Sequence, residues 1–504
     1  MLSIRAQRCS HKVEVVAIDN TSTDGSRAIA QELADRVLDI DDYRPGAALN
    51  QGIEACSGDG IAVVSAHAVP ANDTWLETVA AWLCNPNVVG TYGAQLYPLT
   101  AKFLDKRDLD IFSDLTPRTE TSDTDFWNAN AALRRSFWEK QPFDELVFEL
   151  EDHYWTKCLL PAGGWWVRFE PAGLVYHYGH ELRNDREFLP PSIMTDEERI
   201  ASAIEVLADD VQPWPMVMSA GLTLASLNQH PDIHTAVPLL GRHLVSHEDF
   251  DVRWRMAGAL GRIADPRSAG FLVQGLRDPS FYPRDESAWA LARLGGLAVP
   301  AVLESLAELE SATVAFAALA LGMSGVADAE RRAVALLRAC LASGDVPVVR
   351  DGLYFLGELP VAEAAELVGT VAGSLAGEHD EVTRAAAWCW GQLAALCPSE
   401  RLPGDREIVE LAGCHPLETV RLEAVVALGK LARGLRSQRL LSEVVRALRE
   451  DGAGRVRYGA MQSLRLAARE GMECKAEAAA HDSDIDYGVR FERDLLLGEQ
   501  RAND

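Results

Sequence analysis

A serine and a histidine follow a short apolar segment, at the point where a strand is expected to end. Ile61–Val64 is apolar throughout and predicts a short strand buried on both faces, and Ser65, Ala66 and His67 come directly after it. In open α/β sheets, ligands bind outside the carboxyl ends of the strands. A hydroxyl and an imidazole at this place therefore indicate a binding site. The alternative is a plain exit from the strand, with His67 solvated.

Polar residues also follow the first expected strand, Val13–Ile18. Asp19 stands at its end and can accept hydrogen bonds from a base or a ribose. Asp24 lies in the polar turn that follows, and it could instead cap the next helix. Asn50, on the second expected helix, could bond a base or a phosphate, or it could be a buried amide that the backbone satisfies.

Two further pairs of residues could do chemistry. Glu151 and Asp152 are adjacent carboxylates on a helical pattern, which suits general base catalysis but also suits the first turn of any helix. His177 and His180 form an H-x-x-H pair after the last expected strand, and each could equally be a satisfied or solvated imidazole.

The elements that must position these residues alternate between strands and helices. Strands are expected at 13–18, 37–40, 61–64, 88–92, 165–170 and 174–177, and helices at 26–36, 46–56, 75–83, 127–135 and within 143–158. Such alternation predicts a parallel sheet with crossover helices. Residues 102–124 have no clear period and predict a long functional loop.

From about Met216 the chain changes to an Ala- and Leu-rich helical pattern with a recurring signature. Successive copies close at Gly261, Gly295, Gly322, Gly357, Gly391, Gly429 and Leu464. Their spacing of roughly 34 residues predicts stacked helical pairs, with glycine ending each helix as a C-cap. The Val-Arg pair that opens several copies resembles HEAT repeats. The expected domains are 1–190, a linker at 191–215, an α-solenoid at 216–472, and a capping helix with a polar tail at 473–504.

Composition excludes several classes of function. The 504 residues carry a formal net charge of −27, which repels phosphate backbones, so neither nucleic acid nor an anionic membrane is expected as the main partner. Nine cysteines are scattered without a zinc-type spacing and predict a reducing, cytoplasmic location. No apolar run is long enough to predict a transmembrane helix, and the N-terminus lacks the apolar core of a secretion signal.

The motifs of the first half, taken in order, resemble glycosyltransferase family 2. They read VEVVAIDNTSTDGS, GAALNQGIEACSGDGIAVVSAHAVPANDTWLE, VVGTYGAQLYP, WNANAALRRSFWEKQPFDE, ELEDHYW and EPAGLVYHYGH. The resemblance spans about residues 1–181 and looks like the bacterial branch that includes rhamnosyltransferase-like members. It implies a GT-A fold, α/β with a mixed sheet, ahead of the all-α solenoid. It also implies a nucleotide-diphosphate-sugar donor.

The same resemblance implies roles for single residues. In the family, a carboxylate at the start of this helix takes the acceptor proton, which makes Asp152 the expected general base and Glu151 its orienting or substitute partner. The implied acceptor contacts are Trp127, Asn128 and Asn130. The implied nucleotide-sugar contacts are Asp19, Asn20, Ser22, Asp24, Asn50, Ser65 and His67.

The family usually has Asp-x-Asp where this chain has Ser65-Ala66-His67, and those carboxylates hold a divalent cation against the diphosphate. The replacement weakens a Mg²⁺ site, whereas Mn²⁺ tolerates imidazole better. The family often has a histidine near the metal at the position of His177. The expected ligands of a Mn²⁺ or Mg²⁺ ion are therefore His67, His177 and His180, with direct donation from His177 to phosphate as the alternative.

One departure concerns the start of the chain. Family members have another strand and helix before VEVVAI, and that strand is central to the sheet. Either the start codon is assigned too late or the enzyme is damaged, and we favour the first interpretation. Real loss of the strand would leave an exposed apolar edge.

Together these patterns predict a cytoplasmic, inverting hexosyltransferase. It would use a nucleotide-diphosphate sugar and a hydroxyl acceptor on a glycan, peptide or protein. The HEAT repeats would recruit the acceptor or a partner protein. The alternative is an inactive transferase-like domain on a HEAT-repeat binding scaffold. A third interpretation, a HEAT-type lyase acting on pigments, leaves the first half of the chain unexplained.

Overall fold

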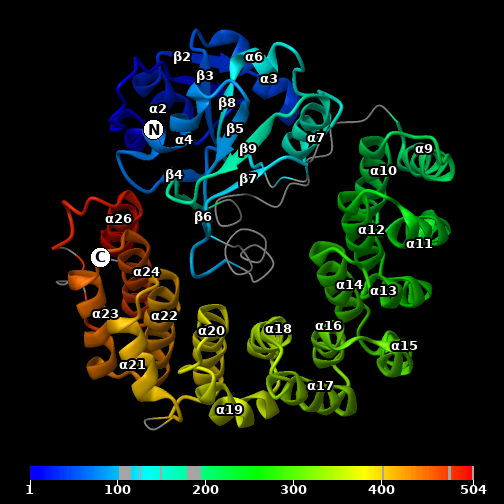
Figure 1. The fold of residues 1–504 in the computed structure, drawn as a ribbon, viewed down its shortest axis with the longest axis vertical. Coiled ribbons are helices and arrows are strands. Elements are labelled where there is room, and N and C mark those ends of the chain that lie inside the picture. Colours follow the sequence, from blue (N-terminus) through cyan, green and yellow to red (C-terminus); the bar gives the residue numbers. More distant parts are fainter. Residues whose placement is uncertain are drawn as a thin grey trace. The chain divides into compact units, whose positions relative to one another are not determined.

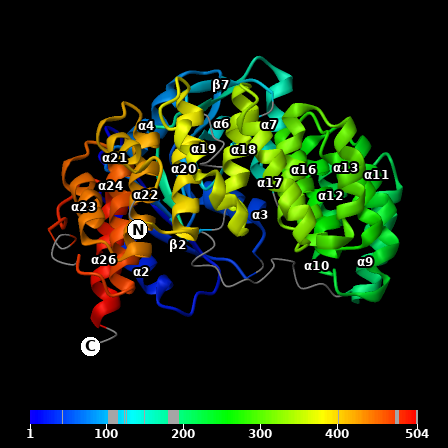
Figure 2. The ribbon, with the colours of Figure 1, turned by 90° about the horizontal axis from the view of Figure 1, so that it is seen from below.

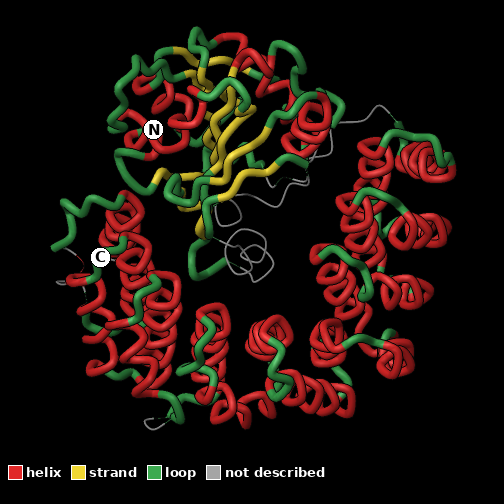
Figure 3. Tube along the Cα trace, in the orientation of Figure 1, coloured by secondary structure: helices red, strands yellow, loops and turns green. Residues whose placement is uncertain are grey.

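The computed structural model describes all residues except 42, 102–114, 123, 125, 148–149, 179–193, 400–401, 475–477, 479 and 502–504. The chain forms two compact units (Figure 1). The first contains Met1–Pro191 with His481–Leu495, and the second contains Ser192–Ala480 with Leu496–Asp504. All described strands belong to the first unit, drawn in yellow in Figure 3. Within the described ranges, no helix combines the length and apolar character that crossing a membrane requires.

The first unit contains three sheets. The largest has the order β3 (Gly60–Val64), β8 (Asn130–Arg134), β5 (Val88–Tyr92), β9 (Trp166–Phe169) and β7 (Arg118–Glu120). Only β5 and β9 are parallel neighbours in it, so the sheet is mixed. The parallel sheet that the alternation predicted is therefore wrong, because β8 pairs antiparallel with both β3 and β5. In the second sheet, β10 (Val175–His177) lies between β4 (Ala68–Pro70) and β6 (Gln95–Leu96). The third pairs β1 (Val16–Asp19) with β2 (Arg36–Asp39) in parallel.

The helices of this unit follow the expected alternation. They are α1 (Leu2–Arg5), α2 (Ser26–Leu33), α3 (Pro45–Ala55), α4 (Trp75–Ala80), α6 (Arg135–Trp138) and α7 (Glu151–Leu159), with 3-10 turns at Ala81–Cys84 and Leu160–Ala162. A core cluster that includes Trp75, Val79, Ala132 and Val175 joins α4 to strands of two different sheets.

The helix expected at 127–135 is wrong, because this segment contains the sheet strand β8. Ala131, Ala132 and Leu133 are at most 1% exposed, between β3 on one side and β5 on the other. Pairing on both edges overrides the helix propensity of alanine and leucine. The strand β3 lies at the edge of its sheet and exposes Ala62, so it is not buried on both faces as expected.

Two other expectations concern loops and edges. The loop expected at 102–124 contains β7, and its part at 102–114 lies outside the described residues. In the described chain, β1 pairs with β2 alone, and its Ile18 is 37% exposed.

The second unit is helical (Figure 2). Its α-helices are α9 (Asp196–Ala208), α10 (Trp214–Ser226), α11 (Val237–Ser246), α12 (Phe250–Ile263), α13 (Ala269–Gly275), α14 (Phe281–Leu294), α15 (Val299–Ser305), α16 (Ser311–Gly322), α17 (Ala327–Leu341), α18 (Val346–Glu358), α19 (Val368–Gly373), α20 (Asp380–Leu396), α21 (Asp405–Cys414), α22 (Glu418–Leu435), α23 (Gln438–Glu450) and α24 (Gly454–Arg469). Short 3-10 turns lie at Pro231–Ala236, Pro266–Ser268, Gly295–Leu297, Leu306–Glu308 and Ala362–Leu367.

The two ends of the solenoid differ from the expected domain boundaries. The segment expected as a linker, 191–215, carries α9, which buries Ile200, Ala203 and Leu207 and starts at a capping box between Thr195 and Glu198. The segment expected as a cap and polar tail, 473–504, carries α26 (Tyr487–Arg501), and its residues His481–Leu495 belong to the first unit. The described residues of α9 and α26 bury apolar side chains, among them Leu207 and Val489.

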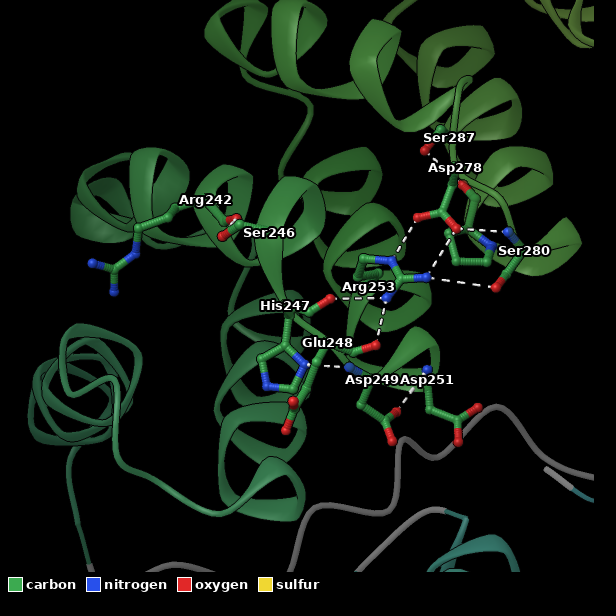
Figure 4. A network of polar contacts seen from close by, with 11 residues as sticks. Arg242, Ser246, His247, Glu248, Asp249, Asp251, Arg253, Asp278, Ser280 and Ser287 are labelled. Atoms are coloured by element: carbon green, nitrogen blue, oxygen red, sulfur yellow. Dashed lines mark hydrogen bonds and ion pairs between the residues drawn. The ribbon is translucent and has the colours of Figure 1, made fainter. Parts of the chain in front are cut away.

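The arginine of the recurring Val-Arg pair joins neighbouring repeats. Figure 4 shows Arg253, whose Nε and Nη2 bond the carboxylate of Asp278 at 2.6 and 3.0 Å. Its Nη1 donates to the carbonyls of His247 and Glu248, at the loop before its own helix. Arg421 repeats this geometry on Asp451, at 2.7 and 3.0 Å. The planar guanidinium suits two-pronged bonding of this kind.

The recurring glycines lie mostly inside helices, so the expectation that each is a C-cap is wrong. Of the glycines at 261, 295, 357, 391 and 429, only Gly295 is a C-cap, and its φ is +59°. At Gly391 an added Cβ would come within 2.8 Å of Ala427 Cβ and 2.9 Å of Ala427 Cα. These glycines allow α20 and its counterparts to lie close to the corresponding helix of the next repeat.

We expect Gly391→Ala to destabilise the protein by about 1–3 kcal/mol, because overpacking outweighs the gain in helix propensity. The matched control is Gly270→Ala on α13, where an added Cβ meets nothing within 4 Å. Urea unfolding followed by circular dichroism measures both. Equal stabilisation by the two substitutions would contradict the close-approach explanation.

Candidate functional site

Two imidazoles face each other where the second sheet meets the turn after β3. The turn 65–67 leads from β3 into β4, and His177 ends β10, which pairs with β4. His67 Nε2 lies 3.0 Å from His177 Nε2, and the two rings meet edge to face at 4.4 Å. Tyr97 packs edge-on against the ring of His177 at 4.9 Å. The sequence prediction that His67 and His177 act together is consistent with this geometry.

The histidine pair alone is a poor site for a hard cation. Among the residues that the structure describes, no three His, Cys, Asp or Glu side chains form a group that could hold a metal ion. Mg²⁺ prefers oxygen ligands, and two imidazoles supply none. His180, the third expected ligand, lies outside the described residues. The donor set among the described residues therefore does not fit a complete protein-made Mg²⁺ site.

Two adjacent carboxylates begin α7. Asp152 is buried, and its Oδ2 and Oδ1 accept hydrogen bonds from the backbone N–H groups of Asn128 (2.8 Å) and His153 (2.9 Å). Glu151 is only partly buried, and its Oε1 accepts a hydrogen bond from the Asn128 side chain at 3.3 Å. The helix starts after Leu150, which adopts a left-handed φ of 58°. Such strained backbone often accompanies functional sites.

Burial raises the pKa of both carboxyl groups. Burial, followed by the charge of Asp152, raises the pKa of Glu151 from 4.5 to about 8. Burial also raises the pKa of Asp152, while the charge of His153 and hydrogen bonds from backbone N–H groups, that of Asn128 first, act in the opposite direction. Because the two carboxyl groups are adjacent, the proton that is retained near neutral pH belongs to the pair.

One short segment, 127–130, connects the carboxylates to the histidine side of the site. The backbone N–H of Asn128 donates to Asp152, and the carbonyl of the next residue, Ala129, accepts a hydrogen bond from Ser65 N at 3.3 Å. Trp127 packs edge-on against His153 at 4.7 Å. The structure thus joins Ser65, Asn128 and Asp152 in one continuous set of contacts.

Two expected binding residues have structural roles instead. Asn130 is fully buried, and its amide nitrogen donates to the carbonyls of Ala94 (2.8 Å) and Gly173 (2.7 Å). Its Oδ1 accepts from Trp75 Nε1 at 2.7 Å, so no part of this amide remains to bind an acceptor.

Asn50 is engaged in the same way. Its amide nitrogen donates to the carbonyl of Phe143 (2.9 Å), and its Oδ1 accepts from Trp138 Nε1 (2.9 Å) and Phe143 N (3.0 Å). The alternative interpretation, an amide satisfied by its surroundings, is therefore the better one for Asn50. Its bonds tie α3 to the segment before α7.

The remaining nucleotide candidates cluster at the carboxyl end of β1. Asp19 is buried and accepts bonds from Ser22 N (3.3 Å) and Arg27 Nη1 (3.1 Å), and these bonds, with Ser22 first, lower the pKa of Asp19. Asn20 and Asp24 are exposed, and Asp24 accepts a bond from Ser26 N at the start of α2, much as a cap would. Their nucleotide contacts remain predictions.

Sequence reasoning missed Arg27, which bridges Asp19 and Asp39 at the ends of two paired strands. Its position in the first turn of the helix after Asp19 was the available signal. It also missed Tyr97, whose ring supports His177.

The raised pKa of Glu151 predicts a pH-dependent loss of stability. The folded state binds this proton more tightly than the unfolded state, so stability falls as the pH rises from about 4.5 towards about 8. Glu151→Gln should reduce this loss in urea unfolding compared between about pH 5 and about pH 8. The exposed Glu139→Gln is the control. If Glu151→Gln and the unmodified chain show the same pH dependence, the raised pKa is excluded.

Two solved structures are distantly similar to the chain. An engineered protein is 19% identical, with 60% of this chain and 88% of that chain covered, at a TM-score of 0.31. Human deoxyhypusine hydroxylase in complex with glycerol is 20% identical, with 54% and 97% covered, at a TM-score of 0.23. At these scores the similarity supports no further conclusion. No curated protein matches the chain significantly.

Family comparisons identify both halves. Residues 1–141 match glycosyl transferase family 2, and residues 216–292 and 237–318 match HEAT repeats. The first match includes the turn at Ser65–His67 and the segment 127–130, while Glu151, Asp152 and His177 lie beyond it. The chain therefore carries a glycosyltransferase family 2 domain that is followed by HEAT repeats.

Proposed function

We propose that this protein transfers a sugar, with inversion, from a nucleotide-diphosphate donor to a hydroxyl group of its acceptor. The observation that carries the proposal is the carboxylate pair at the start of α7. Its contacts through residues 127–130 reach the turn that holds His67. A base on one side and anion-binding groups on the other are what such a transfer needs.

Asp152 is the proposed base. Its carboxylate takes the proton from the acceptor hydroxyl as the acceptor oxygen forms a bond to the anomeric carbon. The bond from that carbon to the donor phosphate breaks, and its electron pair leaves with the nucleoside diphosphate. Glu151 is proposed to hold the proton that the pair retains near neutral pH, because the carboxylate of Asp152 accepts two backbone hydrogen bonds that stabilise its charge.

His67 and His177 are proposed to bind the donor diphosphate. Their Nε2 atoms are 3.0 Å apart, within hydrogen-bond distance of each other. Imidazole N–H groups at this place would donate hydrogen bonds to a phosphate anion. Ser65 would add a hydroxyl donor, while Asp19 would contact the base or ribose of the nucleotide.

Asn128 and Trp127 are proposed to face the acceptor, since both lie beside the carboxylate pair. The HEAT repeats would present an extended surface to the acceptor glycan, peptide or protein, or to a partner protein. The net charge of −27 argues against nucleic acid as that partner.

Asp152→Asn should lower kcat by roughly 10²–10⁴-fold with little change in the donor KM, because it removes the base and keeps the shape. Release of nucleoside diphosphate from a panel of nucleotide sugars measures both constants. Glu151→Gln should retain more activity than Asp152→Asn, and the reverse order would assign the base to Glu151. If no donor in the panel is turned over, the inactive binding scaffold becomes the better interpretation.

His67→Asn and His177→Asn should each raise the donor KM by roughly 10-fold or more, because each removes a hydrogen bond to a charged group. His11→Asn, an exposed histidine of the same unit, is the control. We expect EDTA to cost less activity than either substitution, since two imidazoles alone are a poor Mg²⁺ site. Complete loss of activity in EDTA, restored by Mn²⁺, would instead show that a metal is required.

A further inference from the structure

The segment His481–Leu495 lies more than 300 residues after β10 in the chain, yet it packs with the transferase domain. Figure 1 shows its helix α26 beside β4. Two tyrosines of β10 and its exit meet it. Tyr176 Oη donates to Asp486 Oδ2 at 2.7 Å, and Tyr178 Oη donates to Glu492 Oε1 at 2.9 Å. All four side chains are at most 5% exposed.

His177 stands between these two tyrosines. Successive side chains of a strand point to opposite faces, so α26 covers one face of β10 while His177 projects from the other towards His67. Tyr178 also acts through its backbone, because its N–H donates to the carbonyl of His67 at 2.8 Å. One residue thus contacts α26 with its side chain and the histidine turn with its main chain.

The segment holds the neighbouring strand as well. The N–H of Tyr487 donates to the carbonyl of Ala71 at 2.7 Å, immediately after β4. The C-terminal segment therefore contacts the strands next to both histidines, since His67 directly precedes β4 and His177 ends β10.

The fit between α26 and β10 is specific. Asp486 Oδ1 caps the helix by accepting from the N–H groups of Gly488 (2.9 Å) and Val489 (3.2 Å), while its Oδ2 takes the tyrosine hydroxyl. An added Cβ on Gly488 would come within 2.2 Å of the Tyr176 ring, so the helix can approach this closely only with glycine there. Phe491 packs edge-on against Tyr178 at 4.9 Å.

We propose that the C-terminal segment is an integral part of the transferase domain, in which Asp486 and Glu492 are positioning residues that hold the His67–His177 pair in register for the donor diphosphate. This inference rests on the proposed function. Because the segment acts on the histidines and makes no contact with Asp152 in the described residues, its loss should weaken donor binding rather than proton removal.

The test uses the full chain with Tyr178→Phe, Glu492→Gln and the double variant. Tyr178→Phe removes one hydroxyl and keeps the ring, and we expect it to raise the donor KM by roughly three- to tenfold with kcat within about twofold. In the double variant the two effects on the donor KM should be less than multiplicative, because both residues form the same hydrogen bond. Asp482→Asn, an exposed carboxylate of the same segment, is the control.

A second measurement does not depend on turnover. With ¹⁵N-labelled histidine in the full chain at one fixed pH, we expect the ring signals of His67 and His177 to move in Tyr178→Phe and to stay in place in Asp482→Asn. Assignment uses the His67→Asn and His177→Asn chains.

Unchanged donor KM together with unmoved histidine signals would overturn the inference. So would a double variant whose effect is the product of the two single effects, since the tyrosine and the glutamate would then act separately. If the unmodified chain turns over no nucleotide sugar, the proposed function fails, and the histidine signals alone then decide whether the segment positions the pair.

Discussion

The buried amide of Asn130 is the interaction on which the rest of the site depends. It fixes the start of β8 with three hydrogen bonds, to Ala94, Gly173 and Trp75. Because this point is fixed, the two preceding residues are held in place as well. The backbone N–H of Asn128 donates to Asp152, and the carbonyl of Ala129 accepts from the N–H of Ser65. An unsatisfied amide in this core would be costly, so the geometry of both halves of the site follows from satisfying one side chain.

The same reasoning explains how the solenoid repeats. Neighbouring helices must approach closely, and glycines at positions such as Gly391 permit this approach. They must also keep their register. An arginine clamp, formed by the bonds of Arg253 and Arg421 to a carboxylate of the next repeat, holds that register. The clamp bonds both a carboxylate of the next repeat and the carbonyls of its own loop. Stability in such arrays is a sum of neighbouring interfaces, so a recurring residue at each interface has a recurring effect.

Sequence reasoning predicted what local patterns determine and missed what distant contacts determine. The repeat could be predicted, because its period lies along the chain. The alternation of strands and helices predicted a parallel sheet, whereas the mixed sheet and a joint role for His67 and His177 were implied by the family resemblance alone. The strand β8 could not, since its alanines favour helix until β3 and β5 pair with it. Likewise, no local pattern links Tyr176 to Asp486, 310 residues later. Nor does any local pattern show that the side-chain amides of Asn50 and Asn130 form hydrogen bonds within the fold.

The central claim is that the histidine pair and the carboxylate pair form one site for sugar transfer. A crystal structure of the full chain with a nucleotide sugar and the Asp152→Asn substitution tests it most directly. We expect the diphosphate to contact His67 and His177, with the anomeric carbon facing residue 152. A nucleotide bound away from both imidazoles, or an anomeric carbon that faces away from residue 152, would contradict the account.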